Sequence, residues 1–210
     1  MFDIIEAPYP NNTNIPIQSK SGDISDIDVS KNLILSKPDI IFHLAAIVSG
    51  QAEQEFDLGW DINAKGSWGL FEAIRHQGEN YCPRLVFTSS IAVFGAPFPD
   101  KIPDDFFTTP LTSYGAQKAI SELLLADYSR KKMIDGVSIR LPTICVRPGK
   151  PNLAASGFFS GIIREPLNGQ EAILPVNPEV RHWHATPTAA AGFLVHAAEI
   201  NTSKLSDRIT

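Results

Sequence analysis

The sequence has few cysteines, no long apolar run and no excess of positive charge, and each absence excludes a class of protein. Cys82 and Cys145 are too few for a disulfide framework and lack zinc-site spacing, so we expect free thiols in a reducing compartment. No apolar stretch reaches the roughly 18 residues of a membrane helix. The net charge of −5 argues against a nucleic-acid partner. The acidic start lacks the basic region of a signal peptide, so we expect a cytoplasmic protein without a membrane partner.

The composition that remains is that of an ordinary globular domain, with 210 residues of which 43% are hydrophobic and 20% charged. Short apolar runs alternate with segments that carry apolar residues at helical spacing. This alternation is typical of βαβ units, in which helices cover both faces of a parallel sheet. We therefore predict an α/β fold, a Rossmann-like doubly wound parallel sheet. The expected strands are 2–6, 39–46, 84–88 and 136–141, and the expected helices are 26–36, 53–77, 113–132, 158–167 and 188–199.

The expected helix 113–132 carries Tyr114 and Lys118 four positions apart, hence on one face. Ser113 is the expected N-cap of this helix. The positive helix end and the nearby ammonium both favour a phenolate, so we predict a lowered pKa for Tyr114 and a role as general base. Taken alone, however, such a pair is more often a half-buried tyrosine beside a surface lysine.

A polar residue upstream changes that interpretation. The strand 84–88 runs into a Thr-Ser-Ser sequence that ends at Ser90, and catalytic groups of open parallel sheets gather at the carboxyl ends of strands. A strand, a serine, a loop and Tyr-x-x-x-Lys in this order resemble the Ser/Tyr/Lys constellation of the short-chain dehydrogenases. The resemblance implies an enzyme whose catalytic residues are Ser90, which orients the substrate hydroxyl, Tyr114, which is the base, and Lys118, which lowers the pKa of the tyrosine and binds the nicotinamide ribose.

Further segments resemble the extended branch of that superfamily, which includes nucleotide-sugar epimerases and dehydratases. They are His43-Leu-Ala-Ala46 after a strand, Asp61-Ile-Asn63 in a helix, and 140–149 after another strand. An acidic residue at the end of the first strand takes ribose hydroxyls and favours NAD over NADP. Asp23 has an alternative interpretation as a helix N-cap. The resemblance implies NAD as cofactor and these cofactor-binding residues: Asp3, Asp23, Leu44, Ala45, Ala46, Asn63, Tyr114, Lys118 and Pro142.

The segments 43–63, 113–156 and 160–170 are more similar to one subgroup of this branch, which oxidises the C2 hydroxyl of a four-carbon sugar acid such as D-erythronate with NAD. Arginine suits the carboxylate of such a substrate because its donors form a two-pronged array. The alternatives are salt bridges for the arginines and backbone contacts for the asparagine. A nucleotide-sugar epimerase or dehydratase is the second candidate function. The implied substrate-binding residues are Ser49, Ser90, Tyr114, Arg147, Asn152 and Arg181.

Two histidines, His182 and His184, alternate in an expected strand and point to one face. No third ligand stands at a suitable spacing, so no metal site is predicted. We expect Arg164 to pair with its neighbour Glu165. The resemblance further implies a possible homodimer through the helix that carries Tyr114.

One element of the family is lacking in the 210 residues. No Gly-x-x-Gly-x-x-Gly loop occurs, and Met1 falls within what resembles the second strand. We therefore predict a partial, N-terminally truncated NAD-binding domain over 1–141, and over 142–210 mostly a small substrate-binding lobe that is incomplete at its C-terminus. A fragment of a longer dehydrogenase, a degenerate copy and a non-catalytic interaction module are the three explanations. We expect no saturable NAD binding by the chain alone.

Overall fold

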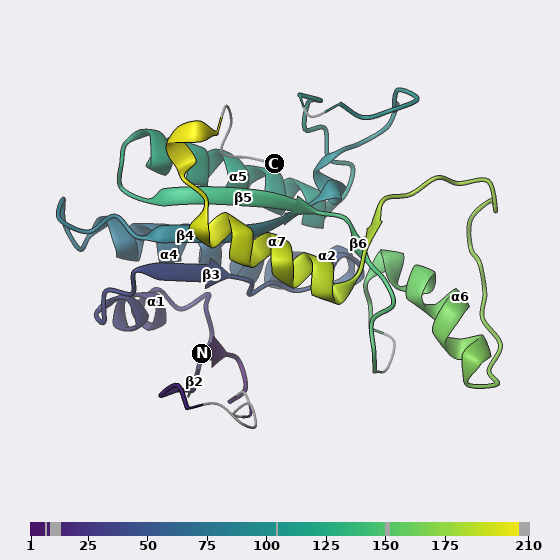
Figure 1. Cartoon of the computed structure of the whole chain (residues 1–210), viewed down its shortest axis with the longest axis horizontal. Coiled ribbons are helices and arrows are strands. Elements are labelled where there is room, and N and C mark those ends of the chain that lie inside the picture. The colour runs from purple at the N-terminus through teal and green to yellow at the C-terminus, as the bar shows by residue number, and fades with distance from the viewer. Residues whose placement is uncertain (7, 9–13, 104, 150–151, 206–210) are drawn as a thin grey trace.

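A three-stranded parallel sheet forms the centre of the computed structural model, which describes residues 1–6, 8, 14–103, 105–149 and 152–205 (Figure 1). Its order is β3 (Ile40–His43), β4 (Arg84–Ser90) and β5 (Asp135–Leu141). Phe42 pairs with Val86, and Val86 pairs in turn with Val137. The predicted α/β fold with parallel strands is confirmed, although β3 ends three residues sooner than expected.

The middle of β4, from Leu85 to Phe87, is apolar, and helices cover both of its faces. Leu85 and Phe87 pack into a cluster with Phe71 of α4 (Gly66–Arg75) and Leu125 of α5 (Ser113–Arg130). The intervening Val86 points to the opposite face, as alternate strand residues do, and packs against α7 (Pro187–Glu199). Figure 1 shows α7 on one side of the sheet and α4 and α5 on the other. The segment after residue 141 thus contributes a layer to the sheet as well as a lobe of its own.

The expected helix 53–77 is divided into several pieces. They are α2 (Ser49–Gln54), α3 (Phe56–Gly59), a π-helix (Trp60–Lys65) and α4. The first break falls at Glu55, whose φ of −118° and ψ of 73° lie outside the helical region. A Cβ atom on Gly59 would lie 2.7 Å from the side-chain nitrogen of Gln117, so only glycine lets this segment approach α5. Short π-helices are often found at functional sites.

The N-terminal part forms a separate pair of parallel strands, β1 (Phe2–Asp3) and β2 (Lys20–Ser21), followed by α1 (Ile27–Ile34). Asp26 caps α1 by accepting a hydrogen bond from the backbone of Asp28, and α1 packs against α4. Within the described residues, β3 has no strand partner on its outer edge.

Beyond β5 the chain forms the smaller lobe of the molecule. The strands β6 (Thr143–Ile144) and β7 (His184–Ala185) pair in parallel, and α6 (Phe158–Leu167) lies between them in the chain. His182 precedes the strand instead of lying in it, which corrects the expected strand through both histidines. The remaining helices are single turns of 3₁₀ type: Ile91–Val93, Ala155–Gly157 and Thr202–Lys204. Within the described ranges, no helix combines the length and the apolar character that a membrane span requires.

The helix α5 begins as predicted at residue 113, but its N-cap is Thr112 and not Ser113. The Thr112 hydroxyl accepts a hydrogen bond from the backbone nitrogen of Gly115, at 3.1 Å. Either hydroxyl is chemically suitable for a cap, and the extended backbone of Thr112 decides between them.

A histidine at the end of β3 is enclosed in the core. The Nε2 atom of His43 lies 2.9 Å from the Ser67 hydroxyl, which itself donates to the backbone oxygen of Asn63 at 2.7 Å. The Ser67 proton is therefore in use, and His43 donates to Ser67 as a neutral imidazole. Burial lowers the pKa of His43 to about 3, and the positive charge of Lys118 acts in the same direction.

The buried His43 makes the stability of the chain depend on pH. Below the ordinary pKa of 6.5 the unfolded chain binds a proton that the folded chain does not, so stability falls as the pH decreases from 6.5 toward about 3. At pH 5 the cost is about 2 kcal/mol. The free energy of unfolding is measured with urea at pH 7.5 and pH 5.0. Its decrease between these pH values should be smaller by about this amount in His43→Phe than in the wild type. This variant keeps an aromatic ring in the core.

The control for this comparison is His76→Phe, because His76 is an exposed histidine at the end of α4. This variant should lose as much stability on acidification as the wild type. Equal losses in wild type and His43→Phe would contradict the assignment of a neutral, buried imidazole.

Candidate functional site

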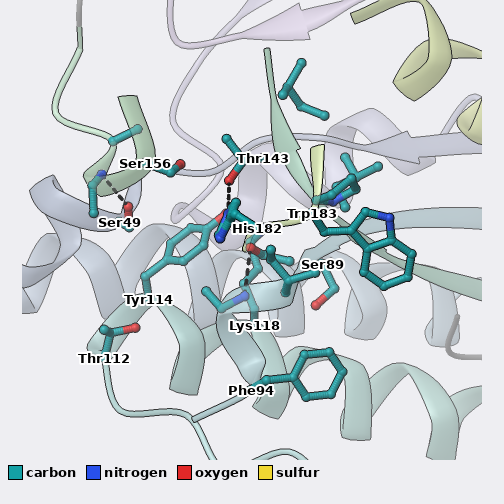
Figure 2. A pocket seen from close by; sticks show the side chains of 18 of the residues that line it. Ser49, Ser89, Phe94, Thr112, Tyr114, Lys118, Thr143, Ser156, His182 and Trp183 are labelled. Carbon is teal, nitrogen blue, oxygen red and sulfur yellow. Dashed lines mark hydrogen bonds between the residues drawn. The ribbon is translucent and has the colours of Figure 1, made fainter. Parts of the chain in front are cut away.

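A cavity of about 990 Å³ opens at the carboxyl ends of β4 and β5 (Figure 2). Its wall combines the loop after β3, the end of β4, the first turns of α5 and the segment after β5. Five predicted site residues are not among its lining: Asp3, Asp23, Ala45, Asn63 and Asn152. The cavity brings together the other predicted site residues, which are Leu44, Ala46, Ser49, Ser90, Tyr114, Lys118, Pro142, Arg147 and Arg181.

Ser90 and Tyr114 meet where β4 ends and α5 begins. Both side chains line the cavity, and the Ser90 hydroxyl influences the pKa of the Tyr114 phenol. The Ser90 hydroxyl also accepts from the backbone nitrogen of Ala92 at 3.2 Å, which fixes its orientation. A Cβ atom on Gly115 would lie 2.2 Å from the backbone oxygen of Ala92, so the helix can start this close to the strand only with glycine there. The serine and the phenol are thus positioned by backbone packing on both sides.

The predicted lowering of the pKa of Tyr114 is wrong for the chain by itself. Burial raises the pKa of Tyr114, and the nearby Ser90 hydroxyl offsets only part of that increase. The Lys118 nitrogen lies 5.7 Å from the centre of the Tyr114 ring. The neutral phenol is therefore the resting form at neutral pH.

Lys118 is a buried ammonium that ties α5 to β4. Its nitrogen donates to the backbone oxygen of Thr88 at 2.8 Å and lies 4.7 Å from the centre of the Phe87 ring. Burial lowers the pKa of Lys118 to about 8, while the carboxylate of Glu122, one turn further along α5, opposes the shift. Near neutral pH the side chain thus keeps its charge at the base of the cavity, with Tyr114 one turn before it.

A buried ion pair supports this arrangement from β5. Arg140 donates to the Glu122 carboxylate through Nε at 3.1 Å and through Nη2 at 2.9 Å. The side chains of Arg140 and Glu122 are 14% and 2% exposed, so water screens the pair little. The guanidinium of Arg140 also lies 4.9 Å from the centre of the ring of Phe94, which lines the cavity. The ion pair therefore connects the lysine-bearing helix to an apolar wall of the site.

Asn63 has a different position from the one expected of a cofactor ligand. Its side-chain oxygen accepts from the backbone nitrogen of Ile47 at 2.9 Å, and its nitrogen donates to the backbone oxygen of Ile47 at 3.3 Å and to Gln117 at 2.8 Å. The amide is buried and fully occupied by these contacts. In this geometry Asn63 fixes the loop after β3, and it is the loop residues Leu44 and Ala46 that line the cavity.

Sequence reasoning did not identify Gln117 as part of this arrangement. Gln117 stands between Tyr114 and Lys118 in the chain and is fully buried in α5. The sequence held one signal for this role: Gln117 is a polar residue directly before Lys118, a lysine that faces the sheet.

The two candidate arginines both line the cavity. The backbone of Arg147 is held at both ends: its nitrogen donates to the Ser160 hydroxyl at 3.1 Å, and its oxygen accepts from Arg164 at 2.7 Å. The expected pairing of Arg164 with Glu165 is present, at 2.5 Å. Arg147 and Arg181 thus supply positive charge to the side of the cavity formed by the smaller lobe.

Ser49 and Asn152 hold backbone in this region. The Ser49 hydroxyl lines the cavity and accepts from the backbone nitrogen of Ala155 at 3.0 Å. Asn152 accepts from the backbone nitrogen of Ala154 at 3.2 Å, which is the alternative role considered for it. Lys150 and Pro151, which directly precede Asn152, lie outside the described residues.

The two carboxylates predicted to bind the cofactor lie in and just after the N-terminal strand pair, and neither lines the cavity. Asp3 accepts from the backbone nitrogen of Ile4 at 2.7 Å. Asp23 accepts from the backbone nitrogen and the hydroxyl of Ser25, at 2.9 Å and 2.7 Å. Both carboxylates stand near the ends of β1 and β2, and their role in cofactor binding stays a prediction.

Several lining residues were missed from the sequence. Thr143 and His182 belong to the smaller lobe, and Phe94, Phe98 and Ile102 belong to the Pro-rich segment after β4. The segment is closed at its base by Gly95, where a Cβ atom would lie 1.8 Å from the backbone oxygen of Thr109. The prolines of this segment are typical of a loop. No pattern in the local sequence indicates that this loop lies over the ends of the strands.

Comparison with known proteins relates this geometry to a family. The profile of the "NAD dependent epimerase/dehydratase family" matches residues 5–201. The chain is 51% identical over 188 residues to D-erythronate dehydrogenase of Cupriavidus necator, covering 90% of this chain and 57% of that protein. It is 48% identical over 168 residues to D-erythronate dehydrogenase of Haemophilus influenzae, covering 80% and 53%. The chain thus spans a little over half the length of the curated relatives it matches.

A solved structure agrees with this assignment in both fold and sequence. The crystal structure described as the nucleoside-diphosphate-sugar epimerase from Agrobacterium tumefaciens superposes with a TM-score of 0.91 at 57% identity. The match covers 97% of this chain and 60% of that chain.

Removal of the arginine from the buried ion pair provides a test of the site's framework. In Arg140→Met the Glu122 carboxylate stays buried without its partner, and such a change costs about 3–5 kcal/mol. Urea unfolding at neutral pH should show this loss, and it should shrink when Glu122→Gln is added. The control is Lys31→Met, which breaks the exposed pair with Asp28 and should cost much less. An Arg140→Met cost no larger than that of the control would contradict the proposed framework.

Proposed function

The chain belongs to the NAD dependent epimerase/dehydratase family, and from this premise we propose that its cavity is the catalytic half of an NAD-dependent sugar-acid dehydrogenase. The observation that carries the proposal is the convergence of Ser90, Tyr114 and Lys118 on a cavity that also receives Arg147 and Arg181. An alcohol-oxidising group and an anion-binding group in one cavity suit a hydroxy acid. The two curated relatives named D-erythronate dehydrogenase support the same substrate class.

The proposed reaction needs a group that takes the proton of a secondary alcohol. Tyr114 is that base, and Ser90, which lines the same cavity, orients the substrate hydroxyl. The resting phenol must lose its proton before it can act, and the buried ammonium of Lys118 stabilises the negative charge that results. Bound NAD would supply the acceptor for the hydride, which leaves the carbon that carries the reacting hydroxyl. In the reverse direction, the neutral phenol favoured by burial is the form that returns the proton.

The cavity residues fit the nicotinamide end of NAD. A volume of about 990 Å³ exceeds what a four-carbon acid fills, so a nicotinamide ribose can lie beside it. Leu44, Ala46 and Pro142 would form apolar contacts, and Tyr114 and Lys118 would meet the ribose. The 210 residues contain no glycine loop for the pyrophosphate. The fit therefore concerns one half of the cofactor.

The finer proposal concerns which hydroxyl reacts. Guanidinium groups bind carboxylates through paired hydrogen bonds. With the carboxylate at Arg147 and Arg181, the adjacent C2 hydroxyl is the one that we place at Ser90 and Tyr114. The substrate would then be D-erythronate or a similar four-carbon acid oxidised at C2.

A nucleotide-sugar epimerase is the second candidate, and one observation favours it: the structure from Agrobacterium tumefaciens carries that description at 57% identity. The same two arginines could bind a diphosphate. The two functions differ in the substrate that binds and in whether reduced cofactor is released.

A second copy of the chain is part of the proposal as the partner of α5. Ile120 and Leu123 of this helix are 36% and 65% exposed. A second copy of the chain would cover this apolar surface. Trp68 of the neighbouring α4 is 49% exposed. Sedimentation equilibrium that finds only monomer at micromolar concentration would remove this part of the proposal.

The role of Tyr114 predicts a large loss of turnover in Tyr114→Phe. The assay follows NADH formation from D-erythronate in a chain extended at its N-terminus by the family's glycine loop. Removal of a general base costs about 10²–10⁴-fold in rate, and we expect about 10³-fold. Tyr128→Phe is the matched control, because Tyr128 lies on the same helix, bonds to Glu72 and does not line the cavity. Undiminished turnover in Tyr114→Phe would disprove the mechanism.

The carboxylate site distinguishes the two candidate functions. Arg147→Gln and Arg181→Gln should each raise KM for D-erythronate about tenfold or more, since each loses a charge-assisted hydrogen bond. The chain that keeps both arginines should neither epimerise nor bind UDP-glucose. Epimerisation of UDP-glucose without oxidation of any sugar acid would support the second candidate instead.

A further inference from the structure

Two residues of the smaller lobe line the cavity without a role in the proton and hydride transfer. Thr143 begins β6 and His182 stands just before β7, 39 residues apart in the chain. The Thr143 hydroxyl and the Nε2 atom of His182 are 2.7 Å apart, a short hydrogen bond. Figure 2 shows this pair in the same cavity as Tyr114 and Lys118. Both side chains therefore offer polar atoms to whatever occupies the cavity.

The pair is held rigidly by its surroundings. Thr143 donates its backbone nitrogen to the oxygen of Trp183 at 3.1 Å, and it pairs with His184 in the β6–β7 register. The His182 ring stacks on Phe159 of α6, with centroids 4.5 Å apart and planes at 20°. Stacking fixes the ring plane and the hydrogen bond fixes its rotation. Such a preorganised polar group binds a ligand without a large loss of side-chain freedom.

The charge state of the pair suits an alcohol and not an anion. Burial lowers the pKa of His182, and the neighbouring His184 acts in the same direction. The imidazole is therefore neutral at neutral pH, and a neutral imidazole has one donor and one acceptor nitrogen. Whichever way the shared proton lies, the pair can either donate to or accept from a hydroxyl group. In the proposed function, the substrate carboxylate is bound by the charged side chains of Arg147 and Arg181, which line the same cavity.

We propose that Thr143 and His182 form a subsite that binds a substrate hydroxyl other than the one oxidised, so that His182 selects polyhydroxy acids over their deoxy analogues. This inference rests on the proposed sugar-acid dehydrogenase function. A site built around a hydroxyl rejects an analogue without it, because the polar atoms of the site then stay unpaired. For D-erythronate the candidates are the C3 and C4 hydroxyls.

The test compares two acids that differ only in those hydroxyls, D-erythronate and D-2-hydroxybutanoate. Their dissociation constants are measured by calorimetry on the chain extended at its N-terminus by the family's glycine loop, with NADH present so that neither acid is oxidised during the titration. The decisive variant is His182→Phe, which keeps a ring against Phe159 and removes both nitrogens. We expect the wild type to prefer D-erythronate, and His182→Phe to lose about tenfold of that preference. Affinity for D-2-hydroxybutanoate should be unchanged.

His184→Phe is the matched control. His184 also contacts Phe159, at 4.7 Å between centroids, but is not among the residues that line the cavity. The ratio of the dissociation constants of this variant for the two acids should equal that of the wild type. Thr143→Val, which removes the hydroxyl at nearly constant volume, should reduce the preference as His182→Phe does. The double variant should lose little more than either single one, since the two groups act as a pair.

The possible results distinguish a failure of the subsite from a failure of the proposed function. A wild-type chain that binds neither acid contradicts the proposed function, and the subsite with it. A wild type that prefers D-erythronate, together with His182→Phe and Thr143→Val that keep the full preference, overturns the subsite alone. Thermal melting followed by circular dichroism identifies a variant that has not folded, and the remaining single variant then decides.

Discussion

The buried ammonium of Lys118 is the constraint on which the site depends. A charge without water must have partners supplied by the protein, and three residues supply them. The backbone oxygen of Thr88 in β4 accepts a hydrogen bond, the ring of Phe87 offers its face, and Glu122 of α5 contributes opposite charge. These contacts fix α5 over the end of the sheet. Tyr114, one turn earlier on the helix, is thereby placed at the end of β4 beside Ser90.

Much of this arrangement could be predicted from the sequence. The run 84–88 indicated a strand buried on both faces, and the order of Ser90, Tyr114 and Lys118 along the chain indicated that they would meet. The pKa of Tyr114 could not be predicted in the same way, because its direction depends on how completely the tertiary structure removes water from the phenol. The use of the Asn63 amide was equally hidden, since its partner Gln117 is 54 residues away.

The cavity divides its chemistry between the two parts of the chain. In the proposed reaction, the sheet and α5 supply the groups for proton transfer, and the smaller lobe supplies arginines, a threonine and a histidine that suit the polar groups of a small hydroxy acid. Local sequence predicted the first set well because strand ends and helix spacing are local. It predicted both arginines of the second set but missed Thr143 and His182, since a long connection between α6 and β7 brings His182 back to Thr143. In the proposed function, part of the substrate selection thus depends on residues with a weak sequence signal.

The most direct test of the central claim follows the hydride itself. D-Erythronate carrying deuterium at C2 is supplied with NAD to the chain extended by the glycine loop, and the reduced nicotinamide is examined by mass spectrometry. The account predicts that each NADH formed carries one deuterium, because the carboxylate held by Arg147 and Arg181 places C2 at Ser90 and Tyr114. Reduced cofactor without deuterium would contradict oxidation at C2, and no reduction of NAD would contradict the proposed dehydrogenase.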